Sequence, residues 1–365
     1  MRRLTKLSAV AAVAALALAG CGGSDSEGSD GGGGGDKSAS SSDDVCKSAD
    51  GDGPKIGLAY DVGGRGDQSF NDSAYAGLEK AVDEFDATCV EGEATDGEAE
   101  SAREDRLRNM AEDGATAIVG VGFAYSESVN AVAPDFPEVN FAVIDGFDPD
   151  DTANDNVAYL GFAEEQGSFL VGVAAAQKSQ SGTIGFVGGV NTELIQKFEA
   201  GYTAGAKAAK PDIKVEVQYI QESDLSGFGD PAGGKAAATG EFDKGADVVY
   251  HAAGGSGSGV FDAAVEAGEG NFAIGVDSDQ YLTATAAQKP FILTSMLKRV
   301  DTATYDFVKS IDAGSPLTSY AVYDLAKDGV GYSTSNESAI SDLTTSIDEY
   351  KAKIISGEIT VPTKP

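Results

Sequence analysis

The sequence contains no tryptophan and a single histidine, His251, in 365 residues. A catalytic triad or a Cys–His pair would therefore have to use His251, and a metal site built from several histidines is excluded. Basic residues are also scarce, with 26 Lys and Arg against 59 Asp and Glu and a formal net charge of −33. Because nucleic-acid phosphates are bound by clustered Lys and Arg, we expect no nucleic-acid partner.

The amino-terminal apolar segment is too short to cross a membrane. It covers residues 7–19, about thirteen residues where a membrane-spanning helix needs roughly 20. A basic start followed by such a segment is typical of a signal peptide. The segment ends in Leu18-Ala19-Gly20-Cys21, which resembles a bacterial lipobox. We predict a lipoprotein signal peptide at 1–20 and a lipid on Cys21 that anchors the protein to the outer face of the cell membrane. An ordinary signal peptide with a chance cysteine is the alternative.

Residues 21–53 are rich in Gly, Ser, Asp and Glu and contain too few apolar side chains to fold alone. We predict a disordered tether with a root-mean-square span of roughly 30 Å. Two cysteines remain besides Cys21: Cys46, near the end of this segment and before the first expected strand, and Cys89, at the start of the second expected strand. Because an exported protein can keep a disulfide, we predict a Cys46–Cys89 bridge. Two unpaired thiols are the alternative.

From residue 55 onward, short β-like runs alternate with helical patterns, which predicts parallel sheets covered by helices on both faces. Two such runs of about 100 residues indicate two similar lobes, at 54–162 and 163–297. We expect strands at 55–60, 89–94, 117–121, 141–145, 157–162, 183–187, 214–220, 247–252, 272–276, 292–296 and 319–324. We expect helices at 71–85, 98–112, 126–133, 164–177, 192–209, 231–244, 259–267, 300–311 and 338–355.

Small or polar residues follow several of the expected strands. Parallel strands would bring these loops to one edge of each sheet, where open α/β sheets bind ligands. Glycine after a strand is also ordinary turn chemistry, but its repetition favours a site. The loop at Gly254 lacks both the G-x-G-x-x-G spacing and the lysine of a phosphate loop. The loops are Asp61-Val-Gly-Gly, Gly120-Val-Gly-Phe123, Asp145-Gly, Gly188-Gly189, Ala253-Gly254-Gly255-Ser-Gly257 and Gly275-Val-Asp277-Ser-Asp279-Gln280.

Three stretches carry a resemblance to a known family: Asp61-Val-Gly-Gly-Arg-Gly-Asp-Gln-Ser-Phe70-Asn71, Gly275-Val-Asp277-Ser-Asp-Gln280 and Thr294-Ser-Met-Leu-Lys298. With them, residues 55–355 resemble the basic membrane protein family. These are lipoproteins that serve as substrate-binding components of ABC importers, many of them for purine nucleosides. The resemblance implies an α/β periplasmic-binding-protein type I fold, in which two doubly wound parallel-sheet lobes surround a ligand cleft. It also implies that a segment near 298–318 returns to lobe 1 and that 319–365 belongs to lobe 2.

The resemblance further implies that a flat base is held between two aromatic rings. Phe70 would supply one ring from lobe 1 and Phe228 the other from lobe 2. Asp61 and Asn71 would face polar edges of the base. Stacking on an aromatic side chain contributes roughly 1–3 kcal/mol per base. Phe228 as a hydrophobic loop residue that packs under a lobe is the alternative interpretation.

A sugar pocket follows from the same resemblance. Asp277 would accept hydrogen bonds from ribose hydroxyls, and such charge-assisted bonds are among the stronger kind. Lys298 and the backbone at Gly254 and Gly255 would complete the pocket, with Asp145 as a further candidate. We expect Asp277 and Lys298 to neutralise each other in the closed cleft. A turn-forming role for Asp277 and a surface position for Lys298 are the alternatives.

These features predict a membrane-tethered receptor that captures a nucleoside outside the cell and delivers it to the permease of an ABC importer. The expected switch is closure of the lobes about a hinge. A receptor for another small solute, such as a sugar, and a ligand sensor are the alternatives. A nucleoside hydrolase would need a tight aspartate cluster holding Ca²⁺, whereas a glycine loop separates Asp61 from Asp67. We therefore expect no enzyme activity, no cofactor and no metal.

Overall fold

The computed structural model describes residues 45–148 and 154–365. The predicted signal peptide, the predicted lipidation site Cys21 and most of the predicted tether lie outside these residues. The first described element is the helix α1 (Val45–Ser48), within the range expected for the tether. The disulfide between Cys46 and Cys89 is formed, with an S–S distance of 2.05 Å. It ties α1 to the edge of the first sheet, so the folded body begins at Val45 instead of after residue 53.

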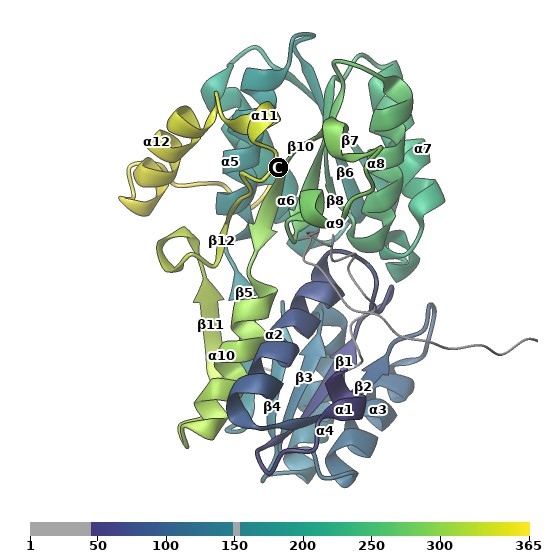
Figure 1. Cartoon of the computed structure of the whole chain (residues 1–365), viewed down its shortest axis with the longest axis vertical. Coiled ribbons are helices and arrows are strands. Elements are labelled where there is room, and N and C mark those ends of the chain that lie inside the picture. The colour runs from purple at the N-terminus through teal and green to yellow at the C-terminus, as the bar shows by residue number, and fades with distance from the viewer. Residues whose placement is uncertain (1–44, 149–153) are drawn as a thin grey trace, which may run out of the picture. The chain divides into compact units, whose positions relative to one another are not determined.

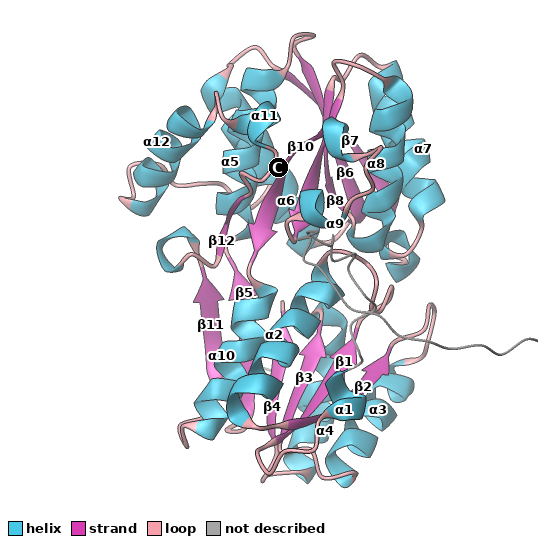
Figure 2. Cartoon of the chain, viewed as in Figure 1, coloured by secondary structure: helices cyan, strands magenta, loops and turns pink. Residues whose placement is uncertain are grey.

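Two six-stranded sheets form the cores of two lobes (Figures 1 and 2). The lobe 1 sheet has the order β11-β5-β4-β3-β1-β2, and every neighbouring pair is parallel. Its helices are α2 (Phe70–Phe85), α3 (Glu100–Glu112), α4 (Ser126–Val132) and α10 (Val300–Asp312). Its strands are β1 (Lys55–Tyr60), β2 (Thr88–Glu93), β3 (Ala117–Val121), β4 (Asn140–Ile144), β5 (Val157–Phe162) and β11 (Ser319–Tyr323).

The central strands of lobe 1 are buried on both faces because helices cover each side of the sheet. On β1, Ile56 and Leu58 belong to one core cluster with Leu78 of α2, while Ala59 belongs to a second cluster with Leu107 of α3. Alternate residues of a strand point to opposite faces. This explains why the strand sequence is a continuous apolar run and not an alternating one.

The lobe 2 sheet has the order β12-β10-β9-β8-β6-β7 and is parallel except for β12, which runs antiparallel to β10. Its helices are α5 (Glu164–Lys178), α6 (Glu193–Ala209), α7 (Pro231–Asp243), α8 (Gly257–Ala267), α9 (Gln280–Thr283), α11 (Glu337–Ile340) and α12 (Thr344–Ile355). Its strands are β6 (Thr183–Val190), β7 (Lys214–Gln221), β8 (Val248–Ala252), β9 (Phe272–Asp277), β10 (Ile292–Lys298) and β12 (Val330–Tyr332).

Helices α5 and α6 approach each other closely through glycines. A Cβ added to Gly172 would lie 2.1 Å from the carbonyl oxygen of Tyr202, and one added to Gly205 would lie 2.0 Å from that of Phe169. Neither backbone can move away without separating the helices, so larger residues are excluded at both positions. This packing fixes α6, whose amino-terminal half faces the cleft between the lobes.

The chain passes between the lobes after β5, after β10 and after β11. The last passage corrects the expected boundary, because β11 pairs in parallel with β5 and therefore extends the lobe 1 sheet. Only residues from Asp324 onward return to lobe 2. Two further differences concern the carboxyl-terminal part: β12 was not expected, and the expected helix at 338–355 is divided into α11 and α12. The remaining expected elements are present with small shifts in their ends.

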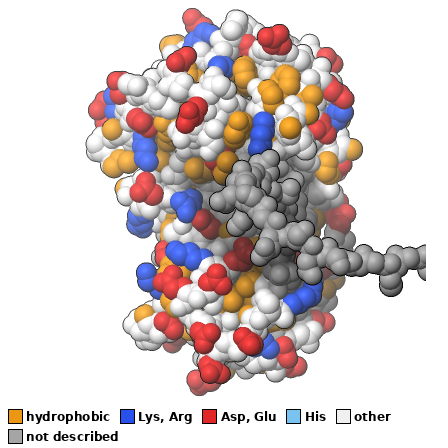
Figure 3. All heavy atoms as spheres, viewed as in Figure 1, with side chains coloured by type: hydrophobic (Ala, Val, Ile, Leu, Met, Phe, Trp, Pro, Cys, Tyr) orange, Lys and Arg blue, Asp and Glu red, His pale blue; other side chains and the backbone are white. Residues whose placement is uncertain are grey.

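Acidic side chains are spread over both lobes on the face shown in Figure 3, with basic side chains scattered between them. Within the described residues, no helix combines the length and the apolar character that a membrane span requires.

Candidate ligand-binding site

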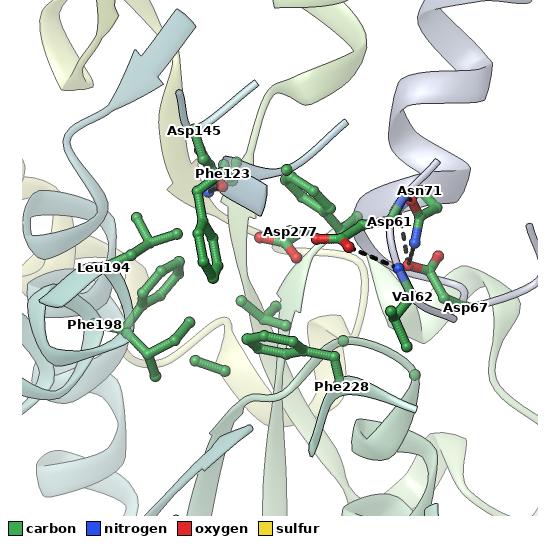
Figure 4. Close-up of a pocket in the computed structure, with 18 residues that line it drawn as sticks. Asp61, Val62, Asp67, Asn71, Phe123, Asp145, Leu194, Phe198, Phe228 and Asp277 are labelled. Atoms are coloured by element: carbon green, nitrogen blue, oxygen red, sulfur yellow. Dashed lines mark hydrogen bonds and ion pairs between the residues drawn. The ribbon is translucent and has the colours of Figure 1, made fainter. Parts of the chain in front are cut away.

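A cavity lies between the two lobes, at the carboxyl ends of strands from both sheets (Figure 4). It encloses about 570 Å³ of space not filled by atoms, including open solvent at its mouth. Lobe 1 contributes residues that follow β1, β3 and β4, and lobe 2 contributes residues at the ends of β8, β9 and β10. This is the edge at which open parallel sheets place their ligands.

Every residue that the sequence suggested for ligand contact lines this one cavity. These residues are Asp61, Phe70, Asn71, Asp145, Phe228, Gly254, Gly255, Asp277 and Lys298. Four more lining residues belong to strand-end loops that the sequence singled out without a predicted contact, namely Val62, Gly122, Phe123 and Val276. Sequence reasoning predicted no contact for the remaining ones, which are Asp67, Leu194, Ile195, Phe198 and Ala252.

The loop between β1 and α2 is held by Asp67. Its carboxylate accepts hydrogen bonds from the backbone N–H groups of Ser69 (2.9 Å), Asn71 (2.9 Å) and Asp72 (3.1 Å) at the start of α2. The Asn71 amide donates to the same carboxylate at 3.1 Å and accepts the N–H of Asp61 at 3.1 Å. The Asn71 side chain thus uses its oxygen and one N–H for hydrogen bonds inside the loop, and these bonds position Asp61.

Asp61 presents a buried carboxylate at the end of β1. Its Oδ1 accepts the N–H of Val62 at 2.8 Å. Burial raises the pKa of Asp61 to about 6, although the Val62 amide and the charge of Arg103 act in the opposite direction. Gly122 leaves room for this group, since a Cβ there would lie 2.4 Å from Asp61 Oδ2 and the residue has a φ of 109°.

Aromatic rings reach the cavity from both lobes. Phe70 begins α2 in lobe 1, and Phe228 ends a short 3₁₀ turn (Leu225–Phe228) in lobe 2. The Phe228 ring lies against the backbone of Gly189, where an added Cβ would approach the ring to 2.6 Å. Figure 4 shows Phe123 and Phe198 at one end of the cavity, with Asp61 and its hydrogen-bonded neighbours at the other.

Lys298, at the end of β10, is the centre of a buried charge cluster. Its Nζ lies 2.5 Å from Asp145 Oδ2 and 3.3 Å from Glu164 Oε1, and all three side chains are at most 4% exposed. Glu164 also pairs with Lys197 at 3.2 Å. The expected mutual neutralisation of Asp277 and Lys298 is therefore replaced by ion pairs of Lys298 with Asp145 and Glu164. Burial alone would lower the pKa of Lys298, but these carboxylates raise it.

The Lys298 ammonium also lies among aromatic rings from both lobes. Its distances to the ring centres of Phe70, Phe162 and Phe198 are 5.2, 5.0 and 5.4 Å, within the range of cation–π attraction. The surface position considered for Lys298 is wrong, because the residue is only 2% exposed.

Asp145 and Asp277 occupy corresponding places in the two lobes. Both follow or end a strand, and both have left-handed backbone angles, with φ of 60° and 63°. Burial raises the pKa of Asp145 to about 6 and that of Asp277 to about 7, each partly offset by the Lys298 charge. Asp145 Oδ1 is buried and has no hydrogen-bond partner among the described residues. A ligand donor in the cavity would satisfy it.

The single histidine does not line the cavity. His251 lies in β8, fully buried, with its ring edge-on to Phe261, and burial lowers its pKa to about 4. In the parts of the chain that the structure describes, no group of three or more His, Cys, Asp or Glu is placed to hold a metal ion.

Two doubly wound lobes connected by three passages, with a polar and aromatic cleft between them, define a two-lobed solute-binding protein. Residues 55–365 match the model of the Bmp family, described as "ABC transporter substrate-binding protein PnrA-like". The chain belongs to this family of ABC transporter substrate-binding proteins.

Individual relatives cover most of the chain. "CD4+ T-cell-stimulating antigen" of Listeria innocua is 36% identical, covering 89% of this chain and 93% of the relative. "ABC transporter nucleoside-binding protein BmpA" of Lactococcus lactis is 33% identical, covering 87% and 94%. A solved structure of an ABC transporter solute-binding protein from Aeropyrum pernix has a TM-score of 0.74 and 29% identity, covering 85% of this chain and 93% of that one.

Proposed function

We propose that this protein binds a nucleoside with a purine base in the cleft between its lobes and delivers it to the permease of an ABC importer. One observation carries the proposal. Phe70 from lobe 1 and Phe228 from lobe 2 line the same cavity as the carboxylates Asp61, Asp145 and Asp277. A ligand that matches this lining needs a flat apolar face together with several hydrogen-bond donors.

The acceptors in the cavity suit the donors of a nucleoside. Asp277 and the unpartnered oxygen of Asp145 are acceptors for ribose hydroxyls, and Asp61 for an N–H of the base. Each ring that stacks on the base contributes roughly 1–3 kcal/mol. A site built to pair these hydroxyls rejects a ligand that lacks one, because a buried carboxylate then stays unpaired. The name of the Lactococcus lactis relative, a nucleoside-binding protein, agrees with this ligand class.

Delivery to an importer places the protein outside the cell. We propose that residues 1–20 are removed, that Cys21 is lipidated, and that the following residues connect the lipid to the folded body at Val45. Lipid on Cys21 would keep the cleft close to a permease in the same membrane. Metabolic labelling with a fatty acid tests this, and loss of the label in Cys21→Ala is the expected result. A label that persists in this variant contradicts the anchor.

A thermal-shift screen tests the ligand class, since a ligand of the folded state raises the melting temperature. Inosine, guanosine, adenosine, hypoxanthine, ribose and glucose form the panel. At a hundredfold excess over Kd a ligand stabilises by about 2.7 kcal/mol, which is roughly 4 °C for a chain of this size. We expect this shift with a purine nucleoside and little with hypoxanthine or ribose alone. A shift with sugars only would contradict the proposal, as would release of free base from inosine.

A further inference from the structure

Hydrogen bonds that join the two lobes converge on Ser69. This residue is 0% exposed and precedes α2 in lobe 1, at the N-cap position. Its Oγ lies 3.0 Å from Asp277 Oδ2 and 3.1 Å from the carbonyl oxygen of Val276, both in lobe 2. From lobe 2, the Ser278 Oγ donates a hydrogen bond of 2.8 Å to the backbone oxygen of Ser69. One residue of lobe 1 thus contacts three consecutive residues of lobe 2.

The Ser69 hydroxyl is available for this contact because Asp67 caps the helix in its place. A serine before a helix usually accepts a backbone N–H from the first turn. Here the Asp67 carboxylate accepts the N–H groups of Asn71 and Asp72, and the Ser69 side chain makes no capping hydrogen bond. The Ser69 hydroxyl therefore has no role in the local structure of α2, and its hydrogen bonds are to lobe 2.

Asp277 connects this contact to the ligand site. It lines the ligand cavity and also a second cavity between the lobes, which Gln68, Asp72 and Ser73 line from lobe 1. The Ser69 hydroxyl fixes Oδ2, which leaves Oδ1 for a ligand. A serine hydroxyl has one hydrogen, and an ionised carboxylate is a stronger acceptor than a carbonyl. Asp277 is therefore the preferred partner of Ser69 when it is ionised.

We propose that Ser69 is a positioning residue for Asp277 and that, with Ser278, it forms a latch that holds the lobes together and that a bound ligand stabilises further. Closure brings Ser69 to Asp277, and the oriented carboxylate then receives a ligand hydroxyl. Ligand binding and lobe closure thereby stabilise each other. The identity of the ligand rests on the proposed function, but the latch is a property of the two lobes themselves.

The test compares Ser69→Ala and Ser278→Ala with a matched control, Ser179→Ala. Ser179 is also buried, at 5% exposed, and its hydroxyl accepts one hydrogen bond, from the Gly182 N–H, at the opposite edge of the lobe 2 sheet. Inosine affinity is measured by calorimetry on the full chain. Removing a hydrogen bond to a charged group predicts about 10- to 150-fold weaker binding for Ser69→Ala, and removing a neutral one predicts about fivefold for Ser278→Ala. We expect no change for the control.

The pH dependence of ligand affinity distinguishes the positioning of the Asp277 carboxylate by Ser69 from the contact that joins the two lobes. Asp277 faces Lys298, whose charge lowers its pKa, and Asp145 and Asp67, whose charges raise it; the Ser69 hydrogen bond also lowers it. Losing that bond raises the pKa of Asp277, so the fall in affinity on acidification begins at higher pH in Ser69→Ala. In Ser278→Ala, which does not touch the carboxylate, this fall stays at the wild-type pH.

Hydrogen exchange of the ligand-free protein tests the latch independently of any ligand. Peptides covering 66–75 and 274–283 should exchange faster in both serine variants than in the wild type or the control. If inosine binds to none of the proteins, the proposed function fails while this measurement still decides the latch. Affinity, pH dependence and exchange equal to those of Ser179→Ala would overturn the proposal. If Ser69→Ala does not fold, unchanged affinity and exchange in Ser278→Ala would overturn it.

Discussion

Replacing Lys298 by methionine should destabilise the whole protein and not only weaken ligand binding. The Lys298 ammonium is 2.5 Å from Asp145 and 3.3 Å from Glu164, and all three side chains are at most 4% exposed. Lys298→Met keeps the length and apolar stem of the side chain but leaves two buried carboxylates facing each other. Removal of one partner from a buried ion pair costs about 3–5 kcal/mol. We expect a loss of this size in the free energy of unfolding at pH 8.

The loss of stability in Lys298→Met should grow as the pH rises. Even beside Lys298, burial raises the pKa of Asp145 to about 6 in the folded state. A folded-state pKa above the unfolded value favours the folded protein at low pH, and this advantage disappears as the pH rises through the folded pKa. Without Lys298 the pKa of Asp145 rises further. Above about pH 6 the difference in the free energy of unfolding between Lys298→Met and the wild type should therefore widen by about 1.4 kcal/mol per pH unit. It should stop widening at the pKa that Asp145 has in the variant.

Urea unfolding at pH 5 and pH 8 measures this gap. Lys197→Met is the matched control, because Lys197 also pairs with Glu164 but is 36% exposed, so its removal costs about 0–1 kcal/mol. Adding Asp145→Asn and Glu164→Gln to Lys298→Met should recover much of the stability, since no uncompensated charge remains. If Lys298→Met unfolds at the same urea concentration as Lys197→Met at pH 8, the charge cluster does not stabilise the fold as we argue.

Three further predictions follow from other parts of the structure. Phe70→Ala and Phe228→Ala should each weaken inosine binding in calorimetry by about 5- to 150-fold, the equivalent of 1–3 kcal/mol of stacking, with little change in melting temperature; unchanged affinity in both would remove the aromatic clamp. Burial raises the pKa of Glu241 to about 9, so the stability that its proton provides is complete below about pH 4.5 and is lost as the pH rises toward 9. Glu241→Gln should therefore raise the melting temperature at pH 8.5 but not at pH 5, and an equal shift at both would contradict this. Reduction of the Cys46–Cys89 disulfide, which joins residues 43 positions apart, should lower the free energy of unfolding by up to about 4 kcal/mol, and a melting curve unaffected by reductant would argue against it.

The parts of the fold that could be predicted are those that short-range patterns determine. Buried strands such as β1 and β3 are continuous apolar runs, and each ends at a glycine-rich or polar loop. The lobe to which β11 belongs could not be predicted from its own sequence, because its pairing with β5 joins segments that are distant along the chain. The strand β12 has only three residues, too few for a pattern. The apolar positions of α11 and α12 continue one spacing, which hid the break between the two helices.

The residues of the candidate site also divide into those that sequence patterns indicate and those that only the folded structure brings to the cleft. The loops that contain Asp61, Asp145 and Asp277 were singled out because parallel topology brings strand ends to one edge, and the family resemblance then assigned these carboxylates to the ligand. Phe198 was missed because it reaches the cleft from inside α6, where its spacing is that of any buried helix residue. Glu164 was missed because a glutamate in the first turn of a helix is common and has an ordinary explanation in the helix dipole. Phe123 had a signal, since it ends the Gly120–Phe123 loop, but only the glycines were given weight.

The positions of the charge cluster and of Ser69 indicate how the cleft opens. Lys298 directly precedes one passage between the lobes, and Glu164 directly follows another. Separating Lys298 from Asp145 would break an ion pair between two buried side chains. Separating Ser69 from lobe 2 breaks one neutral hydrogen bond from Ser278 and one hydrogen bond to the Asp277 carboxylate, both of which water can replace. Opening should therefore pivot near Lys298 and be widest at Ser69. Hydrogen exchange without ligand should be faster at 66–75 than at 296–300, and equal rates would contradict a pivot at the charge cluster.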